Sequence, residues 1–527
     1  MFTKIREPHL TKSKFISGLQ CHKKLWLECH SKTDYQEPIP GSGFHIGSKI
    51  GEAAHNLFPD GILIEEAAFE HEAALRSTQN AIDNAAIPAI FEAAFEYNNI
   101  RIRVDILQRH EDGSWSLIEI KSASTVKDHH VNDAALQYYV LTQCGLKIRS
   151  AQVGRINKEY TKTTNTIDWE TYFVLEDQTE AVLARQNLVA TALAEQRSML
   201  AGNEAPEVAP NKNRCSKPYT CEQWEDCTAS KPLDWVHRLY RMNWKVASAL
   251  EISGVVSAAD IPLDYDLSAD QSREYYTHKT GKEFISKGLP DALSDFGPPA
   301  HYLDFEFSRP TLPYFQNTTP TELIAFQWSC HFISNKEELL KLTVSDCLSL
   351  GKGTKPNSHF EYLADGDVDP SRECAEKLLD ILGKDQYPIL VYHATAEKSA
   401  IKSLAKRVPE RSAELLSLLP RLRDLLPVVR SHTCLPEFFK KPLSLSGGTY
   451  SIKTIANAFD PEFDYANLTG IAKGDAAAEA FYRLVSGEFA VDENRQDLRD
   501  TLLAYCQYDT IAMIVIHKGL WNKSGSP

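Results

Sequence analysis

The sequence has few cysteines and no long apolar run, and both shortages restrict the class of protein. Eleven cysteines in 527 residues are too sparse for the disulfide framework of a small secreted domain. The opening segment is polar and lacks the apolar stretch of a signal peptide, and no run reaches the roughly 18 apolar residues of a membrane span. We therefore expect a cytoplasmic protein without a membrane segment, whose cysteines are thiols or metal ligands.

Positive charge is also in short supply. Lys and Arg number 57 against 71 Asp and Glu, which gives a formal net charge of −14 at pH 7. This balance excludes a protein that coats nucleic acid with its whole surface, although it leaves room for local basic grooves. Hydrophobic residues make up 43% and charged residues 24% of the chain, as in ordinary folded domains.

Hydrophobic periodicity divides the chain into three parts. Residues 1–230 mix helical and strand patterns, residues 231–297 predict a helical connector, and residues 298–527 have an α/β order. The expected helices include 11–29, 46–58 and 133–146, and the expected strands include 99–107, 115–121, 301–307, 322–332, 338–348 and 388–393. The predicted fold class is therefore α/β.

Two neighbouring predicted strands carry the first candidate site. Glu119 and Lys121 are two residues apart on one strand, so their side chains leave the same face. Asp105 lies on the preceding strand, and the connecting loop decides which residue it faces. A two-residue turn would place Asp105 and Glu119 on opposite faces, whereas a three-residue loop ending in a left-handed Gly113 would pair them. We predict the second register, which gathers the groups that metal-assisted phosphodiester hydrolysis with Mg²⁺ or Mn²⁺ needs.

The pattern Asp105…Glu119-Ile120-Lys121 resembles the PD-(D/E)xK nuclease motif, without its leading proline. An exposed hairpin with an ordinary Glu-Lys pair is the alternative interpretation. Flanking helices strengthen the resemblance to RecB-like nucleases, which implies a restriction-endonuclease-like fold. In that family, a Gln-Tyr motif on the helix after the hairpin contacts DNA or supports the site, a role that falls here to Gln137 and Tyr139.

The same resemblance implies a further metal ligand on a helix before the hairpin. Gly51 stands in the usual histidine position. Either Glu52 or His55 would then supply the ligand, and the sequence leaves the choice open.

Four cysteines form the second pattern. Cys215, Cys221 and Cys227 have five residues between neighbours, and Cys21 stands far upstream. Structural zinc sites use tighter pairs, so this spacing makes a poor zinc ribbon. One cysteine before a RecB-like core and three after it resembles the 4Fe-4S staple of CRISPR-associated RecB-like nucleases and AddB-type helicase-nuclease subunits. The resemblance implies a structural cluster, with Cys29 as the alternative to Cys21.

Acidic residues near the C-terminus form the third pattern. Asp304 and Glu306 share one face of an apolar strand, where two carboxylates are costly without a cation between them. Tyr505 and Asp509 are four residues apart on a predicted helix and so lie on one face. Glu397 lies in the first turn of a helix that follows another predicted strand.

These pieces resemble the DEDDy branch of the DnaQ-like exonucleases, which have an RNase H-like fold and digest 3′ to 5′. Four acidic side chains hold two metal ions in that family, and the tyrosine orients the attacking water. The resemblance assigns catalytic roles to Asp304, Glu306, Glu397, Tyr505 and Asp509. Two departures are Glu397, where the family usually has Asp, and His393, where it often has Asn; Asp424 is expected to be structural.

The whole arrangement resembles an uncharacterised bacterial family that fuses the two nuclease-like parts. It implies a metal-dependent DNA exonuclease that acts on single-stranded or duplex ends in repair, recombination or defence. The implied cofactors are Mg²⁺ or Mn²⁺ and a 4Fe-4S cluster, and a helicase is a candidate partner. The alternative is a nucleic-acid-binding scaffold or defence-system subunit with one active nuclease site or none.

Overall fold

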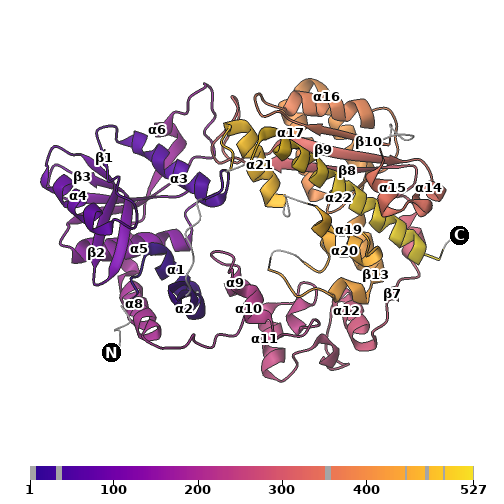
Figure 1. Cartoon of the computed structure of the whole chain (residues 1–527), viewed down its shortest axis with the longest axis horizontal. Helices are drawn as coiled ribbons and strands as arrows, with labels where there is room; N and C mark the ends of the chain where they lie inside the picture. The colour runs from indigo at the N-terminus through magenta and orange to yellow at the C-terminus, as the bar shows by residue number, and fades with distance from the viewer. Residues whose placement is uncertain are drawn as a thin grey trace. The chain divides into compact units, whose positions relative to one another are not determined.

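The computed structural model describes residues 8–30, 38–350, 358–445, 448–468, 474–490 and 493–525. The chain divides into two compact units. The first comprises Met1–Trp224 and Pro310–Thr321, and the second comprises Glu225–Arg309 and Glu322–Pro527. Both units combine helices with a mixed sheet, which confirms the α/β class (Figure 1). Residues 231–297 fall within the second unit.

The first unit is built on a six-stranded sheet whose strands follow one another in chain order. They are β1 (Ile62–Leu63), β2 (Ala89–Tyr97), β3 (Ile100–Arg109), β4 (Trp115–Ile120), β5 (Ile148–Ile156) and β6 (Phe173–Asp177). Strands β2, β3 and β4 are antiparallel neighbours, whereas β4 and β5 are parallel. A parallel pair needs a long crossover connection, and α5 (Asp128–Gln143) provides it.

The two hairpins of this sheet set its register. Asn98 and Asn99 both have left-handed backbones, with φ of 50° and 60°, and form the two-residue turn between β2 and β3. Between β3 and β4, the His110 N–H donates to the Ser114 carbonyl across a three-residue loop, and Gly113 has φ of 75°. The predicted loop and its left-handed glycine are confirmed.

Helices of the first unit pack on the sheet around an apolar core to which α1, α2, α4, α5 and α8 contribute. The helix predicted over 11–29 is broken at Cys21, whose extended backbone separates α1 from α2. The helix predicted over 133–146 begins earlier, at Asp128. The helices are α1 (Lys12–Gln20), α2 (His22–His30), α3 (Gly43–Ala54), α4 (His71–Asp83), α5, α6 (Trp169–Tyr172), α7 (Thr179–Ala184), α8 (Gln186–Leu200) and α9 (Lys212–Cys215).

The second unit is built on a five-stranded sheet in the order β10-β9-β8-β11-β12. The strands are β8 (Ala300–Ser308), β9 (Ile324–Ile333), β10 (His359–Leu363), β11 (Ile389–Val391) and β12 (Leu422–Asp424). The central strand β8 runs antiparallel to β9 and parallel to β11. A separate pair joins β7 (Phe284–Ile285) to β13 (Thr433–Cys434).

The strand predicted over 338–348 is wrong, because this stretch forms two short helices. The side chains of Asn335 and Thr343 cap them by accepting from the N–H groups of Glu338 and Asp346. Helices assigned to this unit, beginning at its border with the first, are α10 (Trp224–Thr228), α11 (Trp244–Ile252), α12 (Ala269–Thr280), α13 (Leu289–Leu293), α14 (Lys336–Lys341), α15 (Val344–Leu348), α16 (Ser371–Leu382), α17 (Thr395–Arg407), α18 (Ser412–Ser417), α19 (Leu425–His432), α20 (Ile452–Phe459), α21 (Gly474–Ser486) and α22 (Arg495–Lys523).

Helix α22 and helix α17 both pack against the central strands β8 and β9. Tyr508 and the six residues from Ile511 to Ile516 of α22 join the apolar core of the unit. Strands β8, β9 and β11 share this core with α22.

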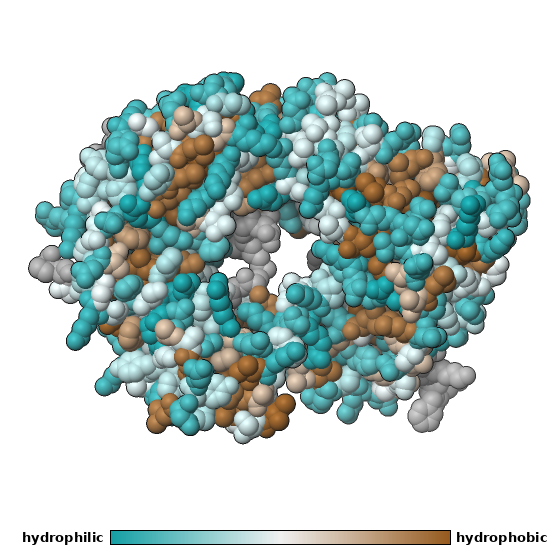
Figure 2. All heavy atoms as spheres, turned by 180° about the vertical axis from the view of Figure 1, so that it is seen from behind, coloured by the Kyte–Doolittle hydropathy of each residue, from teal (hydrophilic) through white to brown (hydrophobic). Residues whose placement is uncertain are grey.

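The surface in Figure 2 is largely hydrophilic, with apolar side chains in scattered groups. The most exposed large apolar side chains are Phe44, Phe69, Ile252 and Leu263, each between 85% and 88% exposed. No helix in the described part of the chain is both long enough and apolar enough to cross a membrane.

Candidate active sites

Three neighbouring strands bring three carboxylates together in the first unit. Ile106 pairs with Ile118 between β3 and β4, so Asp105 and Glu119 are the next residues to face each other, as predicted. Phe91 and Ala93 of β2 flank Glu92 and pair with Ile106 and Val104. Glu92 is thereby level with Asp105. We call Glu92, Asp105, Glu119 and Asp133, with Lys12 and Lys121, the first acidic centre.

Lys121 and Gln137 fix the position of the Glu119 carboxylate. The Lys121 Nζ donates to Glu119 Oε1 at 2.6 Å and to Asp133 Oδ2 at 2.5 Å. The Gln137 Nε2 donates to Glu119 Oε2 at 2.6 Å. Asp133 and Gln137 lie one turn apart on α5, so this helix supplies both supporting groups. Asp105 is held separately, because its Oδ2 accepts from the Ile120 N–H at 2.7 Å.

Lys12 enters the first acidic centre from helix α1. Its Nζ lies 3.2 Å from Asp105 Oδ1 and 3.1 and 3.3 Å from the two oxygens of Glu119. The two carboxylates therefore converge on one cationic atom. The sequence gives no sign of this contact, because Lys12 is far from both residues in the chain.

Burial and neighbouring charge act in opposite directions on these groups. Burial, with the nearby charge of Glu119, raises the pKa of Asp105 to about 7. Burial also disfavours the charge of Glu119, but the ammonium groups of Lys12 and Lys121 outweigh it and lower the pKa of Glu119. The carboxylates around Lys12 and Lys121 raise the pKa of both lysines against the effect of burial. Both lysines consequently stay charged.

Other residues predicted for this site lie elsewhere. Tyr139 packs in the apolar core, edge-on to Tyr97 with ring centroids 6.2 Å apart. His55 stacks on Phe91, and Glu52 is exposed. Within the part of the chain that the structure describes, neither His55 nor Glu52 forms a hydrogen bond or ion pair with Asp105 or Glu119.

Apart from the exposed Cys144, the cysteine residues of the first unit fall into two groups. Cys21, which directly follows α1, lies near Cys215 and Cys221. Burial raises the pKa of Cys221, and the nearby thiols of Cys215 and Cys21 raise it further. The Cys221 N–H donates to the Cys215 carbonyl at 2.7 Å. Cys29 instead packs against the apolar core. Cys227 lies on α10, three residues beyond the first unit.

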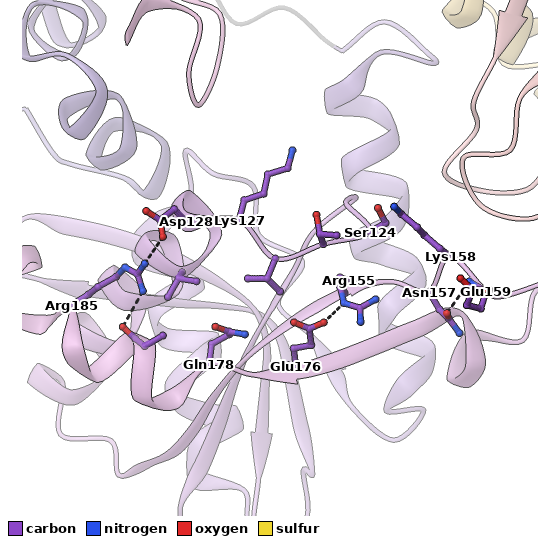
Figure 3. Close-up of a pocket in the computed structure, with 14 residues that line it drawn as sticks. Ser124, Lys127, Asp128, Arg155, Asn157, Lys158, Glu159, Glu176, Gln178 and Arg185 are labelled. Atoms are coloured by element: carbon purple, nitrogen blue, oxygen red, sulfur yellow. Dashed lines mark hydrogen bonds and ion pairs between the residues drawn. The ribbon is translucent and has the colours of Figure 1, made fainter. Parts of the chain in front are cut away.

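A cavity of ≈ 710 Å³ lies on the first unit just after Lys121 in the chain. Ser124 and Lys127 of the β4–α5 connection line it, together with residues that follow β5. Figure 3 shows Arg155 joined to Glu176 and Arg185 joined to Asp128, whereas Lys127 extends away from these pairs. The cavity thus has a partly neutralised basic lining.

The second acidic centre is formed by Asp304, Glu306, Glu397 and Asp509 of the second unit. Oxygen atoms of Asp304, Glu306 and Asp509 all lie within 4.8 Å of one another. Asp304 and Glu306 come from the central strand β8, and Asp509 comes from α22, which packs across that strand. Three carboxylates at this distance could bind a divalent cation.

Burial and mutual repulsion raise the pKa values of this centre. Burial followed by the charge of Asp509 raises the pKa of both Asp304 and Glu306. Burial raises the pKa of Asp509 to about 6, although Tyr465 and Lys453 oppose the change. The charges of the cluster are therefore poorly compensated.

Glu397 lies beside these carboxylates in the first turn of α17. It is 2% exposed, and its Oε2 has no hydrogen-bond partner among the residues that the structure describes. Burial with the charges of Asp424 and Asp509 raises its pKa to about 8. Asp424 has a structural role, since its carboxylate accepts from the N–H groups of His393 and Ala394 at 2.9 and 3.0 Å. His393 is exposed and has a left-handed φ of 68°.

Aromatic and sulfur groups border the second acidic centre. Tyr505 lies one turn before Asp509 on α22, and the Tyr465 hydroxyl donates to Asp509 Oδ1. The Lys453 Nζ lies 4.7 and 5.2 Å from the ring centroids of Tyr465 and Tyr505. The Cys506 thiol is 3.6 Å from Asp304 Oδ2. Tyr465 and Cys506 were absent from the predicted site.

A family model described as a domain of unknown function (DUF2779) matches residues 301–441. The matched segment includes Asp304, Glu306 and Glu397, and it ends before Tyr505 and Asp509. No curated protein and no solved structure matches the chain.

Proposed function

We propose that this protein is a metal-dependent nuclease that hydrolyses phosphodiester bonds of DNA ends. The observation that carries the proposal is the second acidic centre, where three carboxylates lie within 4.8 Å beside the buried Glu397. Buried carboxylates at such distances repel one another, and divalent cations with oxygen ligands relieve the repulsion. The residues present therefore fit Mg²⁺ or Mn²⁺.

The resemblance of the sequence to DnaQ-like exonucleases favours hydrolysis of phosphodiester bonds among the reactions that such a metal site could catalyse. The acidic residues come from a central strand, from the helix after its parallel neighbour and from the C-terminal helix, which agrees with a DnaQ-like, RNase H-like domain. A bound divalent cation would supply Lewis acidity and a nucleophilic water there. Tyr505, four residues before Asp509 on the same helix, would orient that water through its hydroxyl.

The first acidic centre supports a second hydrolytic site of the PD-(D/E)xK type. Asp105 and Glu119 direct oxygens at one cation position, which Lys12 marks at 3.1 to 3.3 Å. Lys121 keeps its proton beside Glu119 and Asp133, so it can offset phosphate charge and position water. Gln137 holds the second Glu119 oxygen and acts as a positioning residue rather than a DNA contact.

The cysteine group is consistent with a structural iron-sulfur cluster. The thiols of Cys215 and Cys221 are close in the chain, Cys21 comes from a distant part of it, and Cys227 follows within a few residues. Thiolate is the ligand that iron-sulfur clusters require. We propose that the cluster ties α1 to the end of the first unit, with Cys21 rather than Cys29 as its first ligand.

A nuclease assay with variants of both centres tests the function. End-labelled single-stranded and duplex DNA is incubated with Mg²⁺ or Mn²⁺ and wild type, Asp304→Asn or Lys121→Met. We expect each variant to lose at least about 100-fold in the cleavage that its own centre performs. Asp380→Asn and Lys147→Met, both on exposed helix or loop surface, are the matched controls.

The assay also decides between two active sites and one. If Asp304→Asn abolishes all cleavage and Lys121→Met does not reduce it, the first centre binds substrate without cleaving it. Absence of cleavage by the wild type, with the metals bound, would favour the alternative of a nucleic-acid-binding scaffold.

A further inference from the structure

Helix α1 places a lysine where a metal ion would bind in the first acidic centre. The Lys12 ammonium contacts Asp105 and both oxygens of Glu119 between 3.1 and 3.3 Å. A divalent cation bound by the same oxygens would lie at roughly 2.0–2.6 Å from them. The ammonium and the ion would then be neighbours in direct repulsion, so the two cannot share the position.

We infer that Lys12 is a tethered cation that holds the metal position of the first acidic centre and must swing out before a divalent ion binds. The inference rests on the proposed function of that centre. Lys12 thereby sets the metal affinity of the centre, and it keeps the buried carboxylates compensated while no ion is bound.

The surroundings of α1 favour a swing of the side chain over a shift of the helix. At its far end, the Gln20 Nε2 donates to the carbonyls of Arg214 and Tyr219 at 2.9 and 2.8 Å. In its middle, the Gln196 Nε2 donates to the Phe15 carbonyl at 3.1 Å. Gly18 lies so close to Gln196 that a Cβ there would be 2.4 Å from the Gln196 side chain.

The anchored end of α1 also leads into the cysteine group. Cys21 directly follows α1, and the carbonyls that hold Gln20 belong to the segment between Asn211 and Cys221. The segment that carries Cys215 and Cys221 therefore positions the helix from which Lys12 extends. Lys12 has a flexible four-carbon stem, so its ammonium can leave the carboxylates while α1 stays in place.

Titration with Mn²⁺ tests the inference without relying on activity. The second acidic centre is silenced with Asp304→Asn and Asp509→Asn, and Mn²⁺ binding is followed by calorimetry and by the electron paramagnetic resonance of free Mn²⁺. We expect Lys12→Met to bind Mn²⁺ at least about tenfold more tightly than the parent, because a competing charge is gone. Lys14→Met, two residues along the same helix, is expected to match the parent.

Two further variants keep the result decisive. Lys12→Arg retains the positive charge, so we expect this variant to bind Mn²⁺ no more tightly than the parent. This expectation can be measured whether or not Lys12→Met folds well. Glu119→Gln is expected to abolish the site in either background. Equal affinities of the parent and Lys12→Met that both depend on Glu119 would overturn the inference and leave the metal centre standing. Absence of any binding that depends on Glu119 would remove the proposed function of this centre as well.

Discussion

The two acidic centres have similar carboxylates and opposite electrostatics. In the first, Lys12 and Lys121 touch the carboxylates directly and lower the pKa of Glu119. In the second, the Lys453 ammonium lies over the rings of Tyr465 and Tyr505, and burial with the charge of Asp509 raises the pKa values of Asp304 and Glu306. The ammonium groups of Lys12 and Lys121 outweigh the effect of burial on the pKa of Glu119, whereas Lys453 does not outweigh it for Glu306 and Asp509.

This difference bears on whether each unit can fold stably before it binds a metal ion. A buried charge cluster is stable only when opposite charges or hydrogen bonds compensate it. The first unit obtains this compensation from its own sequence, so it can fold before it binds metal. The second unit retains a poorly compensated cluster, which costs stability in the absence of a cation. We therefore expect its metal affinity to be the higher of the two.

The largest expected effect is on the free energy of unfolding when one carboxylate charge is removed from each centre. We expect the change to have opposite signs in the two units. Glu119→Gln leaves two half-buried ammonium groups short of a partner, so we expect the first unit to lose about 3 kcal/mol of stability. Asp304→Asn removes repulsion, so we expect the second unit to gain about 1 kcal/mol in EDTA. Urea denaturation in EDTA, followed by hydrogen exchange in peptides of each unit, measures both changes.

Glu111→Gln is the matched control for the first unit, because Glu111 lies exposed in the loop between β3 and β4. It should change stability by less than about 0.5 kcal/mol. Destabilisation of both units by their respective variants would break the contrast between the centres.

A smaller effect is expected from pH in the second unit. The pKa of Glu397 is raised to about 8, so the folded state binds more protons than the unfolded state between about pH 4.5 and 8. Stability in EDTA should therefore fall as the pH rises from 6 to 9, by an amount on the order of 1 kcal/mol. Hydrogen exchange of the second unit across this range measures the slope.

Glu397→Gln should make the stability of the second unit depend less on pH, because this variant lacks the carboxyl group that ionises. It should also raise the stability at pH 9. Saturating Mn²⁺ should flatten the slope in the wild type, since the bound ion compensates the ionised carboxylates. A wild-type stability that rises between pH 6 and 9 in EDTA would contradict the description of the second centre.

Local sequence patterns predicted the strands that carry the acidic residues, and turn chemistry predicted the register that matters most. Gly113 supplied the left-handed position that pairs Asp105 with Glu119. The error at 338–348 has a local cause, because the capping residues Asn335 and Thr343 were overlooked in favour of an apolar alternation.

The groups that were missed divide into those with a signal and those without one. Asn98-Asn99 is a hairpin signal that places Glu92 level with Asp105, and the spacing of Asp133 and Gln137 puts both on one face of α5. Lys12 reaches the first centre through tertiary packing of α1, which no local pattern encodes. Tyr465 likewise lies in a short 3-10 segment whose position depends on contacts with α22.

The smallest expected effect concerns DNA binding near the first centre. Arg155 and Arg185, which line the cavity of the first unit, are already paired with carboxylates, whereas Lys127 and Lys158 are exposed lining residues. If they contact phosphates, Lys127→Ala with Lys158→Ala should reduce the slope of log Kd against log salt by about 1.8 for duplex DNA, because each contact contributes about 0.9. Fluorescence anisotropy with Ca²⁺ in place of Mg²⁺ measures binding without cleavage.

The matched control for this pair is Lys147→Ala, an exposed lysine beside the loop between β3 and β4, with an expected slope change near zero. Performing the titration in Asp304→Asn and in Lys121→Met assigns the contacts to a centre. A reduced slope that persists in both backgrounds would mean that the cavity binds DNA whichever centre acts on it. An unchanged slope would mean that Lys127 and Lys158 do not contact phosphates. The lysines of the first centre are already paired with carboxylates, so we would then expect this unit to have little affinity for nucleic acid.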